Sequence, residues 1–148
     1  MNLKNTRWNK IKHHFSGHPD DLIEVIYNDL NTQSWNNLFI WLTDKIIHLR
    51  TQHDYINPDQ LSLKSFISGE LSYIATIRTK NGLELSLTII NDNTLEIDIE
   101  QSCIQSALAF NDLLESVNNI ASVTGSVDYI ICPEFQTGQA FVVNGKVL

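Results

Sequence analysis

The stretch Leu71–Gln101 reads LSYIATIRTKNGLELSLTIINDNTLEIDIEQ, and it decides the fold. Three segments within it alternate apolar and polar residues, and in each segment the odd-numbered positions are apolar (71–77, 83–89 and 95–99). A period of two is typical of β-strands with one buried and one solvated face. We therefore predict an antiparallel three-stranded meander over about 71–101.

The same parity predicts the turns of the meander. A two-residue Asn81-Gly82 turn would place odd positions opposite even ones, so we expect a three-residue loop that pairs residue 79 with residue 83. Gly82 suits the left-handed last position of such a loop. The same reasoning gives a second loop at Asp92–Thr94, with residue 91 opposite residue 95. Two buried rows then follow, Tyr73-Ile89-Ile97 and Ala75-Leu87-Ile99, and Arg78 lies opposite Glu84 on the solvated face.

Helices are predicted on the N-terminal side of the meander. Thr6 can cap a short helix that carries Trp8, Ile11 and Phe15 on one face. Pro19, Asp20 and Asp21 suit the first turn of a second helix that runs to Leu30. The longest predicted helix spans Ser34–His53, and Asn57–Ile67 forms a short one that Gly69 ends. The apolar stripe of the longest helix consists of Trp35, Leu38, Phe39, Leu42, Ile46 and Leu49.

After the meander, a helix over about 103–121 is expected to open at Ser102 and to cover the apolar face of the sheet. Its apolar side would consist of Ile104, Ala107, Leu108, Leu114 and Val117. A C-terminal strand pair follows, Val127–Ile131 and Gln139–Val143. The predicted class is therefore α+β, in one domain over 1–148.

The charge is distributed unevenly along the chain. The net charge is −7, and no Lys or Arg occurs between Lys80 and Lys146, an interval that holds nine acidic residues. Such a field repels nucleic-acid phosphate and anionic lipid and attracts a basic protein; alternatively, it only keeps the protein soluble. Glu96, Asp98 and Glu100 share one strand face, which is also what a merely solvated strand looks like. The predicted partner-binding residues are Glu84, Asp92, Glu96, Asp98, Glu100, Asp112 and Glu115.

Motifs for catalysis or for a cofactor are missing from the sequence. His13, His14 and His18 suggest a metal cluster, but Gly17 and Pro19 interrupt the helix that would align them, so we predict no metal site. Asp44 and His48 would lie four apart on a helix, where a carboxylate can orient a general base. Cys103 and Cys132 are expected to be small apolar fillers.

The sequence favours a non-enzymatic binding protein, because it carries no catalytic motif. A cytoplasmic location is expected, because no segment has the length and apolarity of a membrane span. Its partner would be a basic protein, and small acidic domains of this kind suit immunity-type inhibitors of bacterial toxins, such as nuclease effectors. Two alternatives stay open. A small enzyme would gather Asp44, His48, His53 or a cysteine in a cleft. An oligomeric structural or adaptor subunit would use a second apolar stripe with Ile40 and Ile47.

Overall fold

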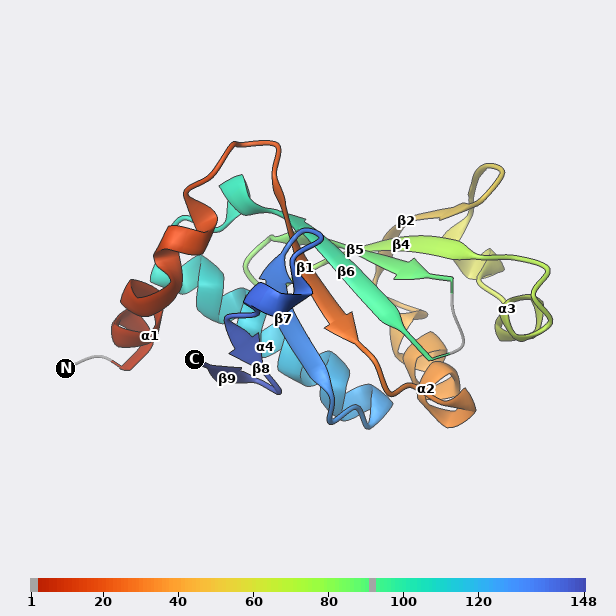
Figure 1. Cartoon of the computed structure of the whole chain (residues 1–148). Coiled ribbons are helices and arrows are strands. Elements are labelled where there is room, and N and C mark those ends of the chain that lie inside the picture. The colour runs from red at the N-terminus through yellow and green to blue at the C-terminus, as the bar shows by residue number, and fades with distance from the viewer. Residues whose placement is uncertain (1–2, 91–92) are drawn as a thin grey trace.

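The computed structural model describes residues 3–90 and 93–148, and within them one antiparallel sheet of nine strands forms the centre of the molecule (Figure 1). The strand order is β3-β2-β4-β5-β6-β1-β7-β8-β9. The strands are β1 Leu22–Tyr27, β2 Ile46–Thr51, β3 Tyr55–Ile56, β4 Tyr73–Arg78, β5 Glu84–Ile89, β6 Leu95–Glu100, β7 Tyr129–Pro133, β8 Val142–Val143 and β9 Lys146–Val147. The α-helices are α1 Leu3–Ile11, α2 Thr32–Leu42, α3 Leu63–Ile67 and α4 Ala107–Thr124. The predicted α+β class is confirmed.

Helix α4 covers one face of the sheet, as predicted. Figure 1 shows it behind β1 and β7, and it packs against α1 and α2. The Tyr27 hydroxyl of β1 donates a 2.6 Å hydrogen bond to the Val117 carbonyl of α4. The helix begins later than expected, with Ser106 as its N-cap, because residues 101–103 form a separate 3-10 turn. Leu108, expected on its apolar side, is 69% exposed.

The meander β4-β5-β6 has the predicted parity, since every odd position of its three strands is buried and faces the helices. The first hairpin is also as predicted. The Thr79 amide donates to the Leu83 carbonyl at 2.8 Å, Gly82 has a φ of +93°, and Arg78 is opposite Glu84.

The second hairpin differs from the prediction by two residues. Ile89 pairs with Leu95, so the buried rows are Tyr73-Ile89-Leu95 and Ala75-Leu87-Ile97. A shift of two residues leaves every side chain on its own face, so the burial pattern cannot separate the two registers. Of the expected Asp92–Thr94 loop, Asp92 lies outside the described residues, and so does residue 91, which was to pair with residue 95.

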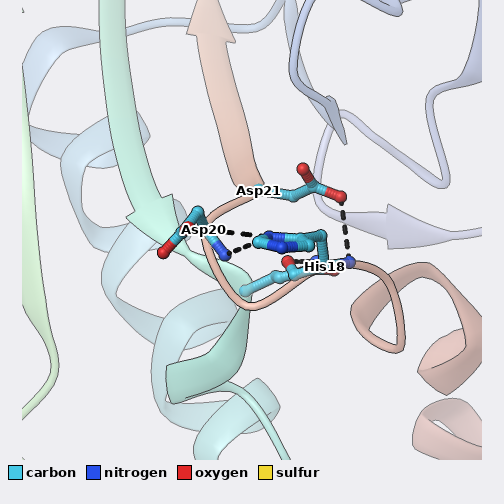
Figure 2. Close-up of polar contacts among 4 residues, drawn as sticks. His18, Asp20 and Asp21 are labelled. Atoms are coloured by element: carbon cyan, nitrogen blue, oxygen red, sulfur yellow. Dashed lines mark hydrogen bonds and ion pairs between the residues drawn. The ribbon is translucent and has the colours of Figure 1, made fainter.

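The predicted helix between Pro19 and Leu30 is wrong, because Leu22–Tyr27 is strand β1 at the centre of the sheet, between β6 and β7. Residues 23–27 are all buried, and Ile23, Val25 and Ile26 are β-branched residues, which favour a strand. The residues expected in the first helical turn form a tight turn instead (Figure 2). The His18 amide donates to Asp21 Oδ2 at 3.1 Å, and the Asp20 amide donates to His18 Nδ1 at 3.2 Å.

The predicted helix Ser34–His53 contains two elements. Its first half is α2, whose N-cap Asn31 forms a capping box with Ser34. The stripe expected on it, Trp35, Leu38, Phe39 and Leu42, is buried. Its second half is β2, which pairs with β4 and β3. The sequence missed the break because Ile46 and Leu49 fit the helical stripe, whereas the alternation of residues 47–51 belongs to a strand.

Candidate functional site

The face of the sheet opposite α4, which we call the open face, carries the even-numbered side chains of β4, β5, β6 and β1. Glu96, Asp98 and Glu100 of β6 lie on it, as predicted from their spacing. β6 is an interior strand of the sheet, between β5 and β1, and does not form a guarded edge. Its neighbours therefore decide the surroundings of these carboxylates.

The register places Glu24 of β1 directly opposite Asp98, and Cys132 of β7 opposite Glu24 on the other side. Directly opposite side chains in an antiparallel pair have Cβ atoms about 4.5–5.5 Å apart. Glu24 is only 7% exposed, and its Oε1 accepts a 3.0 Å hydrogen bond from the Phe135 amide. Sequence reasoning missed Glu24 because it assigned the residue to a helix. The signal that could have found it is the strand-like run LIEVIY around it.

Like charges gather around Asp98. Burial, together with the charges of Glu24, Glu96 and Glu134, raises the pKa of Asp98 from 3.8 to about 6. Burial and Glu24 also raise the pKa of Glu96. We refer to Glu24, Glu96, Asp98 and Glu134 as the carboxylate cluster. Its field reaches the neighbouring thiol, since burial and the charges of Glu24 and Glu96 raise the pKa of Cys132 to about 11.

Cations do not neutralise the carboxylate cluster in the part of the chain that the structure describes, where no Lys or Arg forms an ion pair with any of its four members. Glu84, predicted for the same surface, is different. Its carboxylate lies 3.0 Å from Arg78, and both side chains are about half exposed.

A cavity of about 410 Å³ opens on the open face beside Asp98. It brings three of the predicted residues together, Glu84, Asp98 and Glu100, and Arg50 of β2 is a cation on its wall. The other lining residues are Leu22, Ile74, Ser86, Thr88 and Cys103. The hollow therefore combines acidic and hydroxyl groups with one guanidinium.

The remaining predicted residues lie elsewhere. Asp112 and Glu115 belong to α4 and line a separate cavity of about 580 Å³ with Lys45, Arg78 and Lys80. Asp112 is 3% exposed and accepts a hydrogen bond from the Thr79 hydroxyl. Asp92 lies outside the described residues. The structure thus brings Glu84, Glu96, Asp98 and Glu100 onto one face and separates them from the two α4 residues.

The residues considered for catalysis do not share a helix. Asp44 lies in the turn after α2, where its carboxylate is 3.1 Å from Lys45, whereas His48 is on β2 and His53 follows that strand. Cys103 is exposed and Cys132 is buried.

The histidines near the N-terminus have separate environments. The His14 ring stacks on Phe141, with centroids 4.3 Å apart, and burial and His13 lower its pKa. His18 belongs to the turn before β1 (Figure 2). Over residues 3–90 and 93–148, no three His, Cys, Asp or Glu side chains are arranged to hold a metal ion.

The expected second apolar stripe of the long helix does not exist as one surface, because Ile40 is on α2 and Ile47 is on β2. Ile40 is 68% exposed. None of the helices in the described ranges is long and apolar enough to cross a membrane.

Comparison with known proteins gives a likeness of fold. No protein-family model matches the chain, and no curated protein sequence is significantly similar to it. The structure is similar to a chain in the crystal structure of the toxic C-terminal tip of CdiA from Pseudomonas aeruginosa in complex with immune protein. The TM-score is 0.58 at 18% sequence identity, and the match covers 86% of this chain and 97% of that chain. At this identity the similarity shows a shared fold.

Proposed function

We propose that this protein is a non-enzymatic immunity-type inhibitor that binds a basic bacterial toxin domain through the open face of its sheet. The observation that carries the proposal is the carboxylate cluster, in which Glu24, Glu96, Asp98 and Glu134 come together from β1, β6 and the end of β7 without a paired cation among the described residues. Packing like charges in partly buried positions destabilises a free protein. A basic partner would remove that repulsion on docking.

Electrostatic attraction also suits an inhibitor that has to bind its toxin quickly. Oppositely charged surfaces raise the rate of association by orders of magnitude, and an inhibitor that protects a cell from a toxin has to bind before the toxin acts. With a net charge of −7 and no Lys or Arg between Lys80 and Lys146, the second half of the chain supplies such a field.

The structural neighbour supports this class of protein, since it comes from a complex of a toxin tip with an immune protein. That complex contains a toxin and an immune protein, and this chain could correspond in role to either one. The acidic surface of this chain favours the role of the immune protein. A surface dominated by carboxylates repels nucleic-acid phosphate, which a nuclease toxin must approach.

Neutralisation of a toxin tests the proposal. The chain is co-expressed with the candidate toxin domain encoded by the adjoining gene, and survival of the host and binding of the two purified proteins are measured. We expect protection and a binding constant that falls as salt is added, because charges on the two surfaces are screened.

The matched variants are Asp98→Lys with Glu100→Lys on the open face, and Asp59→Lys with Glu70→Lys away from it, which change the net charge equally. We expect the first pair to slow association by about tenfold or more and to flatten its salt dependence, and the second pair to have a much smaller effect. If both pairs of charge reversals slow association equally, or if the binding constant does not depend on salt concentration, the proposed surface is wrong.

A further inference from the structure

Phe135 is the feature of the open face that folding does not explain. It directly follows Glu134 in the turn after β7, and its side chain is 89% exposed, more than that of any other large apolar residue among those the structure describes. An isolated exposed apolar residue is ordinary. Phe135 is unusual because of how its backbone is held.

The backbone of Phe135 has a φ of +60°, and the Gln136 amide donates to the Pro133 carbonyl at 3.0 Å. This is the pattern of a turn whose third position favours glycine, and a bulky residue there is strained by about 1–2 kcal/mol. Glycine at position 135 would therefore fold more easily and would expose no aromatic ring. The residue is unfavourable for folding on both counts.

Two hydrogen bonds hold this turn on β1. The Phe135 amide donates to Glu24 Oε1 at 3.0 Å, and the Glu134 amide donates to the Leu22 carbonyl at 3.1 Å. Since Glu24 is 7% exposed and belongs to a central strand, it fixes the base of the turn. The ring of Phe135 is consequently displayed from a rigid support at the border of the carboxylate cluster.

We propose that Phe135 is the apolar anchor of the interface, inserted on docking into an apolar pocket of a basic partner protein whose Lys and Arg side chains surround that pocket. The inference rests on the proposed function. Charge complementarity selects this occupant, because Glu24, Asp98 and Glu134 adjoin the turn that carries the ring. Binding energy in a protein interface concentrates in a few buried anchor residues, among which aromatic side chains are enriched, and the rim around them is polar.

The test uses Phe135→Ala and Phe135→Gly in the full chain, with the toxin domain encoded by the adjoining gene as the probe. We expect each variant to weaken binding by about 30-fold or more, as truncation of a hot-spot aromatic does. The thermal midpoint should be unchanged in Phe135→Ala and unchanged or raised in Phe135→Gly, because glycine relieves the backbone strain. Phe135→Tyr should retain most of the affinity.

Leu108→Ala is the matched control, since Leu108 is 69% exposed on α4 and should contribute nothing to binding. An anchor is also distinguished from a charge by salt, because its loss weakens binding by the same factor at low and at high ionic strength. The Asp98→Lys and Glu100→Lys reversals should change the salt slope instead.

The outcomes separate the two proposals. If the unmodified chain binds the toxin domain and the alanine and glycine variants bind equally well, Phe135 is not the anchor and the proposed function stands. If the unmodified chain does not bind, the proposed function is wrong and the anchor is wrong with it. A loss of affinity that follows a fall in the thermal midpoint of both variants would assign Phe135 a structural role and overturn the anchor.

Discussion

At the scale of single residues, Asp98 matters most, because the sequence predicts which face of its strand it lies on and only the fold reveals its environment. The alternation along β6 was sufficient to place Glu96, Asp98 and Glu100 on one face. Burial raises the pKa of Asp98 to about 6 together with the charges of Glu24, Glu96 and Glu134, and Glu24 and Glu134 come from distant parts of the chain. Spacing along one strand cannot show which residues lie across from it.

Replacing Asp98 by Asn should stabilise the protein near neutral pH. The pKa of Asp98 is higher in the folded protein than in the unfolded chain, so the folded state binds its proton more tightly. The stability that this proton contributes is present below about pH 4 and is lost as the pH rises through about 6. Because Asp98 is partly solvated, we expect a gain of only about 1–2 kcal/mol in the free energy of unfolding near pH 7.5.

Chemical denaturation at several pH values measures this gain. It should shrink to nothing below about pH 3, where the carboxyl of Asp98 is protonated in both the folded and the unfolded state. Glu100→Gln is the control, since Glu100 is exposed on the same strand and its replacement should change stability by less than about 0.5 kcal/mol. An Asp98→Asn variant that is equally stable or less stable than the original at neutral pH would contradict the crowding of charge around Asp98.

At the scale of elements, the local sequence pattern was sufficient to predict an element wherever residues close by in the sequence determine its structure. The meander, the first hairpin and the buried stripe of α2 are of this kind. β1 is different, because Leu22, Ile23, Val25 and Ile26 fit a helical spacing as well as a buried strand. What decides between the two is the pairing of β1 with β6 and β7, which follow it by about 70 and 100 residues. No local window contains that information.

The first hairpin supplies a prediction at this scale. Gly82 has a φ of +93°, and a Cβ added there would meet no atom within 4 Å, so an alanine would fit and would suffer only from the backbone conformation. We expect Gly82→Ala to lower the free energy of unfolding by about 1–2 kcal/mol. Gly138→Ala is the control, since Gly138 has neither a positive φ nor a close neighbour and should change stability by less than about 0.5 kcal/mol. Thermal unfolding compares the two, and equal effects would exclude a special role for the left-handed position.

At the scale of the whole molecule, charge and fold are arranged differently along the chain. Basic and acidic residues are nearly balanced up to Lys80. After Lys80, nearly all of the charged residues are acidic. The sheet intermixes the two halves, because β1 from the first half lies between β6 and β7 from the second. Acidic side chains therefore lie in the middle of the sheet, where Asp98 is opposite Glu24, as well as on exposed surfaces.

Salt should consequently stabilise the free protein. Raising the ionic strength from about 0.01 M to about 0.15 M shortens the screening length from about 30 Å to about 8 Å and weakens repulsion among the carboxylates. We expect the thermal midpoint near neutral pH to rise by a few degrees over this range. The rise should be smaller in Asp98→Asn than in Glu100→Gln, because Asp98 lies at the centre of the repulsion. A thermal midpoint that is independent of salt would show that the charges are already compensated.

The central place of β1 also has a consequence for how the protein is made. β1 is synthesised before both of its partner strands, which end at Glu100 and Pro133, so the middle of the sheet cannot be completed until Pro133 has been synthesised. Long-range pairings of this kind give a high contact order and slow folding. Until β7 arrives, β1 presents an unpaired, apolar edge that other chains can join. The nascent protein is therefore exposed to aggregation through this edge until β7 has been synthesised.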